Sequence, residues 1–501
     1  MDAFKLSGND LLGSARGVAI GGAFGALGGD LTGIAQNPAG IGVYRSSEIV
    51  GTLNFSSVNV ESNTLGSITK DSKFNFNFNN IAYVSYTPLS GDVRSFNFGF
   101  AYNRLKNFGK SYQSYRKGLT SSLTDYIANL TTQEANVSPD DLYSYDNNGK
   151  YDPWPYEQEF PWISVLGYNG GLIEDTGDRY VSLLQESETV ERTYSISELG
   201  HIDTYDFTMG TNILDMLYLG LTFSFTDIRY NLDSRHTEEF EFGGGFDLDN
   251  RLTTEGAGYQ VSLGAIFRPV DELRIGVAYH SPTWYNITDY YYAETDCGYD
   301  LNGEWKNFRT HTPNNAATEY KLRTPDRWVM SVAGILGTKA IISLDYEYSN
   351  YSGMKLEDID GYGNTYIKEN DRISKRFTGA SSLKMGLEYN LTPQVALRAG
   401  YSWMQSPLEK SFKSGNKTGD YEVFNVGTIT AYTLDGDVNY FSCGAGYRFT
   451  PNFYMDLAFS FKAQANQLYT YSPSKELEVS SVPAELKNNT SKGLLTLGYK
   501  F

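Results

Sequence analysis

Strands with a period of two dominate the carboxyl-terminal part of the chain. In residues 259–267 (YQVSLGAIF), every second side chain is apolar or aromatic, and most of the residues between them are small or polar. The same alternation recurs in residues 273–279, 383–389, 395–403 and 453–461. A half-buried β-strand shows this period because successive side chains point to opposite faces. The pattern predicts about 14 strands, and it fits either a soluble β-sandwich or an outer-membrane barrel.

The links between the predicted strands alternate between short and long. Pro88–Asp92 (PLSGD), Pro269–Glu272 (PVDE) and Leu391–Gln394 (LTPQ) are short, whereas about 95 residues separate Leu105 from Gly200. Short periplasmic turns and long extracellular loops are typical of an outer-membrane barrel, while a sandwich has no reason to sort its loops by side. We therefore predict an all-β fold: a 14-stranded antiparallel transmembrane β-barrel over residues 48–501, whose largest loop lies at about 105–200.

Composition supports this class and excludes others. The chain has 501 residues, a net charge of −18, 15% aromatic residues and 50 Gly. An acidic chain is a poor nucleic-acid binder, because phosphate neutralisation needs a basic surface. There is no apolar run of about 18 residues, as a membrane helix would need. The opening residues, MDAFKLSGND, are not those of a signal peptide. If the protein is exported, we expect this sequence to be a mature form.

The last predicted strand, Gly493–Phe501 (GLLTLGYKF), ends on outward aromatic residues. Leu495, Leu497, Tyr499 and Phe501 share one face. A terminal aromatic on an alternating last strand resembles the signal read by the bacterial barrel-assembly machinery. We therefore interpret Tyr499 and Phe501 as an assembly signal, the alternative being an ordinary final strand.

Residues 1–47 lack this alternation. Ser14–Gly42 is rich in Gly and Ala, which suits close backbone packing inside a barrel. The Asn37-Pro38 pair predicts a turn, because proline fixes its own φ and biases the preceding residue away from helix. We predict an amino-terminal plug, called the hatch below, over residues 1–47. A flexible leader is the alternative.

The hatch segment resembles the corresponding part of the long-chain fatty-acid transporter (FadL/TodX) family of outer-membrane proteins. The matching residues are Ser14, Arg16, Gly17, Gly21, Gly22, Ala23, Ala26, Leu27, Asn37, Pro38, Ala39 and Gly40. The resemblance extends to Gly276–Pro282 (GVAYHSP) and to LRTPDRW at 322–328. It implies a gate at Asn37, Pro38, Ala39 and Gly40, and a lateral opening caused by a kink in the third strand. By position that strand holds Gly99, which permits a bulge or a close backbone approach.

The sequence carries no motif of enzymatic chemistry. The four His residues show no HExxH or HxxxH spacing, and the two Cys residues form no CxxC pair. We therefore expect no enzyme activity, no metal and no cofactor. Alternation points Arg268, Arg274, Lys384 and Arg398 into the lumen. They are candidate contacts for the carboxylate of an amphipathic ligand; alternatively, they pair with other lumen charges or with the hatch.

The leading functional hypothesis is an integral outer-membrane channel of a Gram-negative bacterium. It would take up hydrophobic small molecules such as long-chain fatty acids passively, with membrane lipid, the ligand and the assembly machinery as partners. The alternative is a barrel that does not transport and that docks surface lipoproteins or an outer-membrane complex through its long acidic loops.

Overall fold

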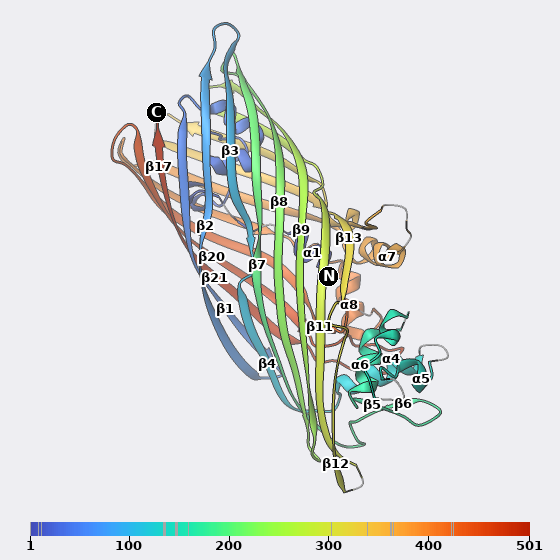
Figure 1. The fold of residues 1–501 in the computed structure, drawn as a ribbon. Helices are drawn as coiled ribbons and strands as arrows, with labels where there is room; N and C mark the ends of the chain where they lie inside the picture. Colours follow the sequence, from blue (N-terminus) through green and yellow to red (C-terminus); the bar gives the residue numbers. More distant parts are fainter. Residues whose placement is uncertain are drawn as a thin grey trace.

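The wall of the molecule is one closed antiparallel sheet (Figure 1). The computed structural model describes residues 2–501 apart from 9, 12, 134–136, 146–148, 159, 302, 338, 361–362, 364, 422 and 424. The last strand, β21 (Ala484–Lys500), pairs with the first, β1 (Glu48–Thr64), along 16 residues, from Glu48↔Lys500 to Asn63↔Glu485. The described strands thus close a 14-stranded barrel, and the predicted fold class is confirmed.

Interruptions divide four of the wall strands into two elements each. These are β3 (Val93–Asn107) with β4 (Lys110–Leu119), β10 (Leu273–His280) with β11 (Trp284–Leu301), β13 (Ala317–Arg323) with β14 (Arg327–Leu336), and β15 (Ala340–Asn350) with β16 (Lys355–Asp358). The other wall strands are β2 (Ser67–Pro88), β7 (Val190–Ile213), β8 (Leu217–Phe240), β9 (Gly245–Val270), β17 (Gly379–Asn390), β18 (Val395–Met404), β19 (Tyr432–Arg448) and β20 (Phe453–Tyr469). A further strand, β12 (Glu304–His311), forms a hairpin with β11.

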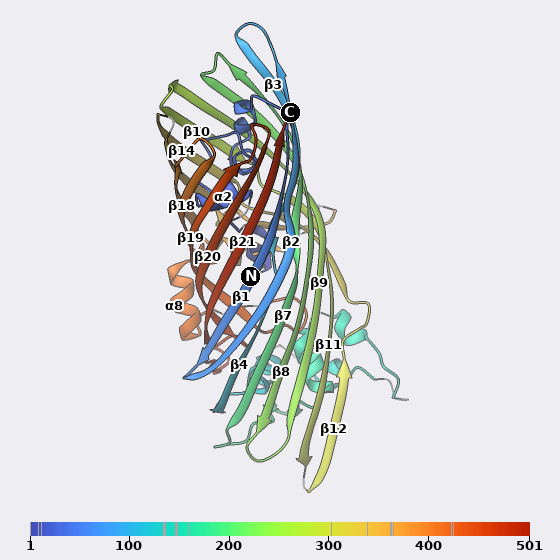
Figure 2. The same cartoon turned by 90° about the vertical axis from the view of Figure 1, so that its left-hand side faces the viewer.

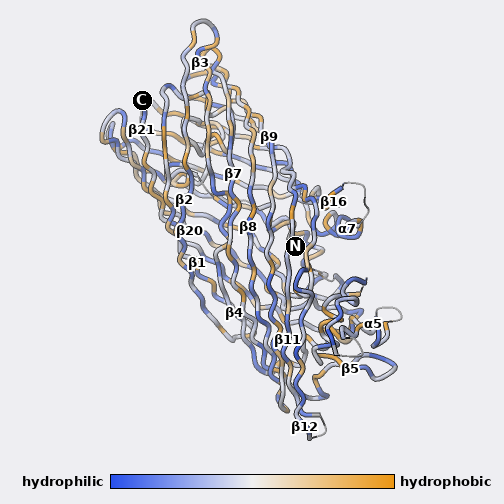
Figure 3. The backbone as a smooth tube through the Cα atoms, viewed as in Figure 1, coloured by the Kyte–Doolittle hydropathy of each residue, from blue (hydrophilic) through white to orange (hydrophobic). Residues whose placement is uncertain are grey.

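Large apolar and aromatic side chains cover the outer face of the wall. Tyr102, Tyr205, Phe225, Tyr259 and Trp284 are successive cross-strand partners on β3, β7, β8, β9 and β11. All five project outward, and Phe225 and Tyr259 are each 57% exposed. Along the wall strands, apolar positions alternate with polar ones (Figure 3). Exposed aromatic residues of this kind are typical of the membrane-facing surface of a barrel, because amphipathic rings favour the membrane interface.

The links predicted to be short lie at the end of the barrel that carries the carboxyl terminus (Figure 1). Two links predicted to be long are short as well, because their strands continue past the apolar belt: residues 65–66 join β1 to β2, and residues 241–244 join β8 to β9, at the other end. Between β7 and β8, Leu214 and Asp215 adopt φ values of 54° and 59°, which allows the chain to reverse in a tight turn. At the other end the wall is longer than the alternation predicted. Both β4 and the first half of β7 lie within the predicted 105–200 loop, because these strands continue beyond the apolar belt. The loop outside the wall therefore runs over residues 120–189.

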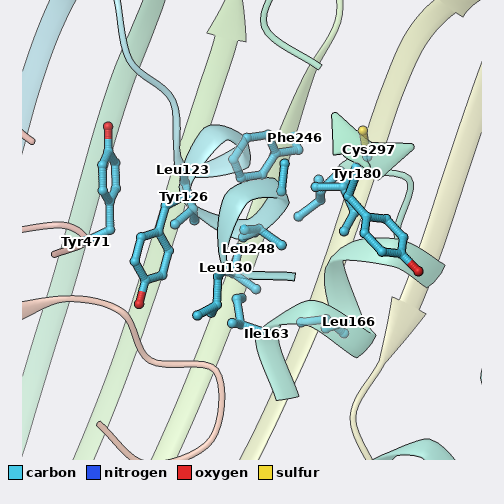
Figure 4. Packing of buried hydrophobic residues seen from close by; sticks show 14 of the residues in the cluster. Leu123, Tyr126, Leu130, Ile163, Leu166, Tyr180, Phe246, Leu248, Cys297 and Tyr471 are labelled. Atoms are coloured by element: carbon cyan, nitrogen blue, oxygen red, sulfur yellow. The ribbon is translucent and has the colours of Figure 1, made fainter. Parts of the chain in front are cut away.

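This loop forms a small helical layer, called the cap below. It contains α4 (Leu123–Gln133), α5 (Pro139–Leu142), η2 (Trp154–Glu157), α6 (Trp162–Asn169) and the hairpin β5 (Ile173–Asp175)–β6 (Tyr180–Ser182). Its apolar residues pack against β9, β11 and Tyr471 (Figure 4). Other loops hold η3 (Tyr351–Gly353), α7 (Ile367–Arg376) and α8 (Lys410–Thr418). None of the described helices is long and apolar enough to cross a membrane.

A buried ion pair joins the cap to the wall. Arg192 Nε donates to Glu238 at 2.7 Å, and its Nη2 atom donates to both the Ser121 carbonyl and the Tyr471 hydroxyl. Glu238 also accepts from the Leu123 amide at the start of α4. Burial by itself would raise the pKa of Glu238, but Arg192 and His236 outweigh burial and hold that pKa at about 2. Glu238 therefore stays ionised and fixes the first turn of α4 to β8.

Candidate functional site

The hatch lies inside the barrel, near the end that carries the carboxyl terminus (Figure 2). It contains α1 (Asp2–Ser7), α2 (Ala15–Ala19), α3 (Leu31–Gln36) and the 3₁₀ helix η1 (Pro38–Val43). Nearly every described side chain between residues 14 and 43 is buried. The Gly- and Ala-rich composition permits this, because small residues let the hatch backbone approach the wall closely.

The predicted Asn37-Pro38 turn is held by one side chain. The Asn37 amide nitrogen donates to the carbonyls of Gly25 in the hatch, at 2.8 Å, and Ala265 in the wall, at 3.1 Å. Its oxygen accepts from the Ala39 amide at 3.1 Å and so caps η1. Pro38 begins η1, where a missing N–H costs nothing. Asn37 thus joins two parts of the hatch to β9.

Wall glycines make room for this turn. Gly220 of β8 and Gly264 of β9 are direct cross-strand partners on the lumen side. A Cβ atom on Gly220 would collide with Pro38, and one on Gly264 would collide with Asn37. On the opposite wall, Gly386 and Gly400 are also cross-strand partners, and both face the hatch at Ile20. The hatch therefore packs directly against the backbone of wall glycines at two places in the lumen.

A buried chain of charges also holds the hatch. Arg16 of α2 donates two hydrogen bonds to Glu388 of β17, at 2.8 and 3.0 Å. Arg398 of β18 contacts Glu388 at 2.6 Å and Asp456 of β20 at 2.5 Å. Arg398 is one of the predicted ligand contacts. In the structure it pairs with other charges of the lumen, which is the alternative role that the sequence analysis gave it.

The other predicted ligand contacts lie apart from one another. Lys384 pairs with Glu347 of β15 and lines a cavity above the hatch. Arg274 donates to the Leu27 carbonyl of the hatch. Arg268 pairs at 3.0 Å with Asp271 in the short β9–β10 turn. Arg268, Arg274 and Arg398 line neither of the two cavities described next, whereas Lys384 lines one of them.

Two neighbouring cavities lie beside the hatch. The first, called the hatch cavity, has about 1700 Å³ of empty space including its opening to solvent, and it is lined by the hatch, Lys384 and many hydroxyl groups, among them Thr204, Thr222, Ser224 and Ser262. The second, called the basic cavity, has about 1360 Å³ on the same measure and lies beside β2, β3 and β19–β21. Asp10 and Arg104 line both cavities. Asp10 gave no signal in the sequence, because its segment has no periodicity.

The wall parts next to the basic cavity. Residues 67–119 are all described, and within them β2 pairs with β3 only from Asn80↔Asn103 to Pro88↔Ser95. Beyond Asn80, side chains replace the backbone ladder: the Asn75 amide nitrogen donates to the Gly109 carbonyl at 2.9 Å. The third strand itself breaks between Asn107 and Lys110. Gly99 does not lie at this break; it is regularly paired, and a Cβ there would meet the Ile41 side chain of the hatch at 2.9 Å.

The predicted assembly signal lies on the outer face at the barrel seam. Phe501 is 59% exposed and stacks on Tyr83 and Tyr499, with ring centroids 6.2 and 6.4 Å apart. Its backbone amide donates to the Ser47 carbonyl, next to the start of β1. Phe501 therefore contacts β21, β2 and the residue that precedes β1, at the seam of the barrel.

Sequence comparison places this architecture in a known family. The family described as outer membrane protein transport protein (OMPP1/FadL/TodX) matches residues 208–501, more than half of the chain. The chain belongs to this family. Two relatives are the 47 kDa outer membrane protein of Pasteurella multocida, 22% identical over 212 residues, and outer membrane protein P1 of Haemophilus influenzae, 23% identical over 204 residues. The matches cover 42% and 41% of this chain, and 45% and 38% of the relatives, so the chain spans less than half the length of either.

Solved structures agree on the fold. A FadL homologue of Pseudomonas aeruginosa has a TM-score of 0.55 at 12% identity, and the toluene transporter TodX of P. putida has 0.53 at 11%. Each comparison covers 98% of this chain and 99% of the other. The shared feature is the barrel. The family consists of outer-membrane transport proteins, and a β-barrel fits that location.

Proposed function

We propose that this protein takes up hydrophobic small molecules, such as long-chain fatty acids, passively across the outer membrane. The observation that carries the proposal is the parting of β2 from β3 beside the basic cavity. The outer face of β2 along the parting bears Phe74, Phe76 and Phe78, exposed by 68%, 54% and 52%. The parting therefore lies at a level where the wall meets lipid, and an apolar ligand would leave the lumen there without crossing the hatch.

The parting has no backbone ladder and is closed by side-chain hydrogen bonds. Among these, Asn75 donates to the Gly109 carbonyl at 2.9 Å, and Thr69 donates to the Gln113 carbonyl. A neutral hydrogen bond of this kind contributes only about 1 kcal/mol net, and a regular ladder would place several backbone bonds along the same stretch. The missing ladder supports lateral release of the ligand at this place.

A reversible disulfide tests this route. A Cβ on Gly109 would lie 3.0 Å from Cγ of Asn75. In Asn75→Cys the sulfur takes the place of that Cγ atom, so it lies close enough to a cysteine at position 109 to form a disulfide. The double variant Asn75→Cys with Gly109→Cys should therefore cross-link. Cys443 is exposed and is first replaced by Ser. Uptake of labelled oleate is measured in cells that lack their own fatty-acid transporter. We expect wild-type uptake above the empty strain, a loss in the oxidised double variant, and recovery with reductant.

The controls are the two single-cysteine variants, which cannot form the cross-link. Equal uptake by the oxidised and reduced double variant would contradict the lateral route while leaving transport intact. No uptake by the wild-type protein would contradict the proposed function itself.

The scaffold alternative has one favourable observation, which is the cap. The cap has its own apolar core and exposes Trp154 and Tyr143 by 46% and 53%. Exposed aromatic residues are enriched where proteins bind one another. Purification from native membranes in mild detergent separates the two functions: a stoichiometric lipoprotein or complex supports the scaffold, and a monomer carrying lipid or fatty acid supports the channel.

A further inference from the structure

A loop segment crosses the mouth of the barrel, which is the end opposite the carboxyl terminus. This segment, residues 425–431 (NVGTITA), lies between α8 and β19 and is called the strap below. The Thr428 hydroxyl donates to the side-chain oxygen of Asn250 in β9 at 2.5 Å. The shorter way round the wall from β9 to β19 passes five strands, which are β10–β11, β13–β14, β15–β16, β17 and β18. In a 14-stranded barrel this hydrogen bond therefore reaches almost the opposite side of the lumen.

The strap is also anchored on its own side of the barrel. The Thr430 hydroxyl donates to the Thr470 carbonyl, directly after β20, at 2.7 Å. The Asn425 amide nitrogen donates to the Ala431 carbonyl at 3.0 Å and so joins the two ends of the strap. Two threonine hydroxyls thus hold the strap to opposite sides of the mouth.

A tyrosine of the wall braces the middle of the strap. Gly427 adopts a φ of 63°, and a Cβ there would lie 2.9 Å from the ring of Tyr291 in β11. Only glycine permits both this backbone conformation and this close contact without strain. The Tyr291 ring also packs edge-on against Trp162 of α6, with ring centroids 4.9 Å apart. The strap therefore contacts a side chain that also packs against the cap.

A cavity lies beneath the strap. It has about 500 Å³ of empty space including its opening to solvent, and its lining includes three apolar strap residues, Leu232 and Leu252 of the wall and Phe4 of α1. Phe4 and Asp435 also line the basic cavity, so the two spaces are neighbours. Part of the strap thus lies over space rather than over packed side chains. It can move without displacing the wall, because the barrel satisfies its own backbone groups.

We propose that the strap is a gate over the mouth of the lumen, separate from the hatch, and that it must leave Asn250 before a ligand passes from the mouth to the cavities beside the hatch. This inference rests on the proposed uptake function and adds a second barrier at the other end of the same path. The two barriers differ in kind. The hatch packs against wall glycines and buried charges, whereas the strap is tied across the mouth by single neutral hydrogen bonds, which are weak enough to open reversibly.

Access to a cysteine beneath the strap tests the gate without any transport. The reporter is Leu232→Cys in a Cys443→Ser background, because Leu232 is 6% exposed and lines the cavity. The purified full-length protein in detergent reacts with a charged methanethiosulfonate, and peptide mass spectrometry gives the labelling rate. Thr428→Val with Thr430→Val keeps the side-chain shapes and removes both hydroxyls. We expect labelling to become roughly 30-fold faster, which is about 2 kcal/mol for two neutral hydrogen bonds.

Thr253→Val is the matched control. Thr253 lies on the same strand as Asn250, but its hydroxyl donates to Asn231 at 2.8 Å, on the other face of the wall. This variant should label the reporter at the unmodified rate. If the strap variant labels no faster than the control, the strap does not cover the cavity and the gate is refuted, whatever uptake shows.

A reversible cross-link tests whether the gate lies on the uptake path. Thr428→Cys with Asn250→Cys, again with Cys443→Ser, replaces two side chains that touch, so a short bifunctional methanethiosulfonate bridges them. We expect oleate uptake, in cells that lack their own fatty-acid transporter, to be lost in the bridged variant and to recover with reductant. The two single-cysteine variants, treated alike, should keep their uptake.

The outcomes separate the gate from the uptake function. Unchanged uptake by the bridged variant would overturn the gate and keep the uptake function. Absence of uptake by the wild-type protein would overturn the proposed function, and the labelling rates would then decide alone whether the strap covers the lumen.

Discussion

Gly264→Ala should loosen the hatch while leaving the barrel intact. A Cβ at this position collides with the Asn37 side-chain oxygen and lies 3.0 Å from both the Ala39 amide nitrogen and Pro38 Cδ. Asn37 cannot keep its place, and its three hydrogen bonds, to Gly25, Ala265 and Ala39, are lost or stretched. At about 1 kcal/mol each, these bonds stabilise the turn by about 3 kcal/mol, which is a factor of roughly 100 in the equilibrium between the closed and the open turn.

Hydrogen exchange of the detergent-solubilised protein, followed by mass spectrometry, measures this loss. We expect peptides that cover residues 37–43 to lose roughly 100-fold in protection, while peptides from the wall strands keep theirs, because the barrel satisfies its own backbone groups. Gly334→Ala is the control: it places the same methyl group on a wall glycine that has no atom within 4 Å. If the two variants exchange alike at residues 37–43, Gly264 does not seat the turn and the packing account is wrong.

Three further predictions concern the ends of the barrel. Phe501→Lys should strongly reduce the yield of heat-modifiable, membrane-inserted barrel, because a charge would replace a ring that faces lipid at the seam; normal yield would refute the assembly signal. A cysteine at Asp140 in the cap should react with a membrane-impermeant reagent on intact cells, and one at Asp271 should not; the reverse pattern would invert the topology. Acid should release the cap, because Glu238 holds it as a carboxylate. The pKa of Glu238 is depressed from 4.5 to about 2, so the ionised group stabilises the folded cap by about 3 kcal/mol. This contribution is complete above about pH 4.5 and is lost as the pH falls toward 2. Urea unfolding followed by tryptophan fluorescence at pH 6 and pH 3 measures that loss, and a Glu238→Gln variant with the same pH dependence as wild type would contradict it.

The sequence alone determined the features that depend on local periodicity. Alternation along 259–267 or 453–461 is a property of consecutive residues, so it predicts a strand and its lipid face without knowledge of the partner strands. The short links predicted the turns at one end of the barrel, although residues 65–66 and 241–244 at the other end are short as well. The Gly-rich hatch segment with Asn37-Pro38 stood out because it lacks the alternation. Strand ends were less certain, because the wall continues past the lipid belt where the apolar face fades, as in β4 and β7.

Only the tertiary structure decided which lumen residues meet. Alternation placed Arg398 and Lys384 on the inner face, but it could not show that Glu388 and Glu347, on neighbouring strands, neutralise them. The contact between Asp10 and Lys462 joins an irregular hatch segment to a strand more than 400 residues away, and the Asn75–Gly109 contact lies where a regular barrel would have a backbone ladder. Such pairings depend on barrel closure and shear, which bring residues together across strands. Local sequence determines which face of the strand a side chain lies on, while closure of the sheet decides which other side chains it contacts.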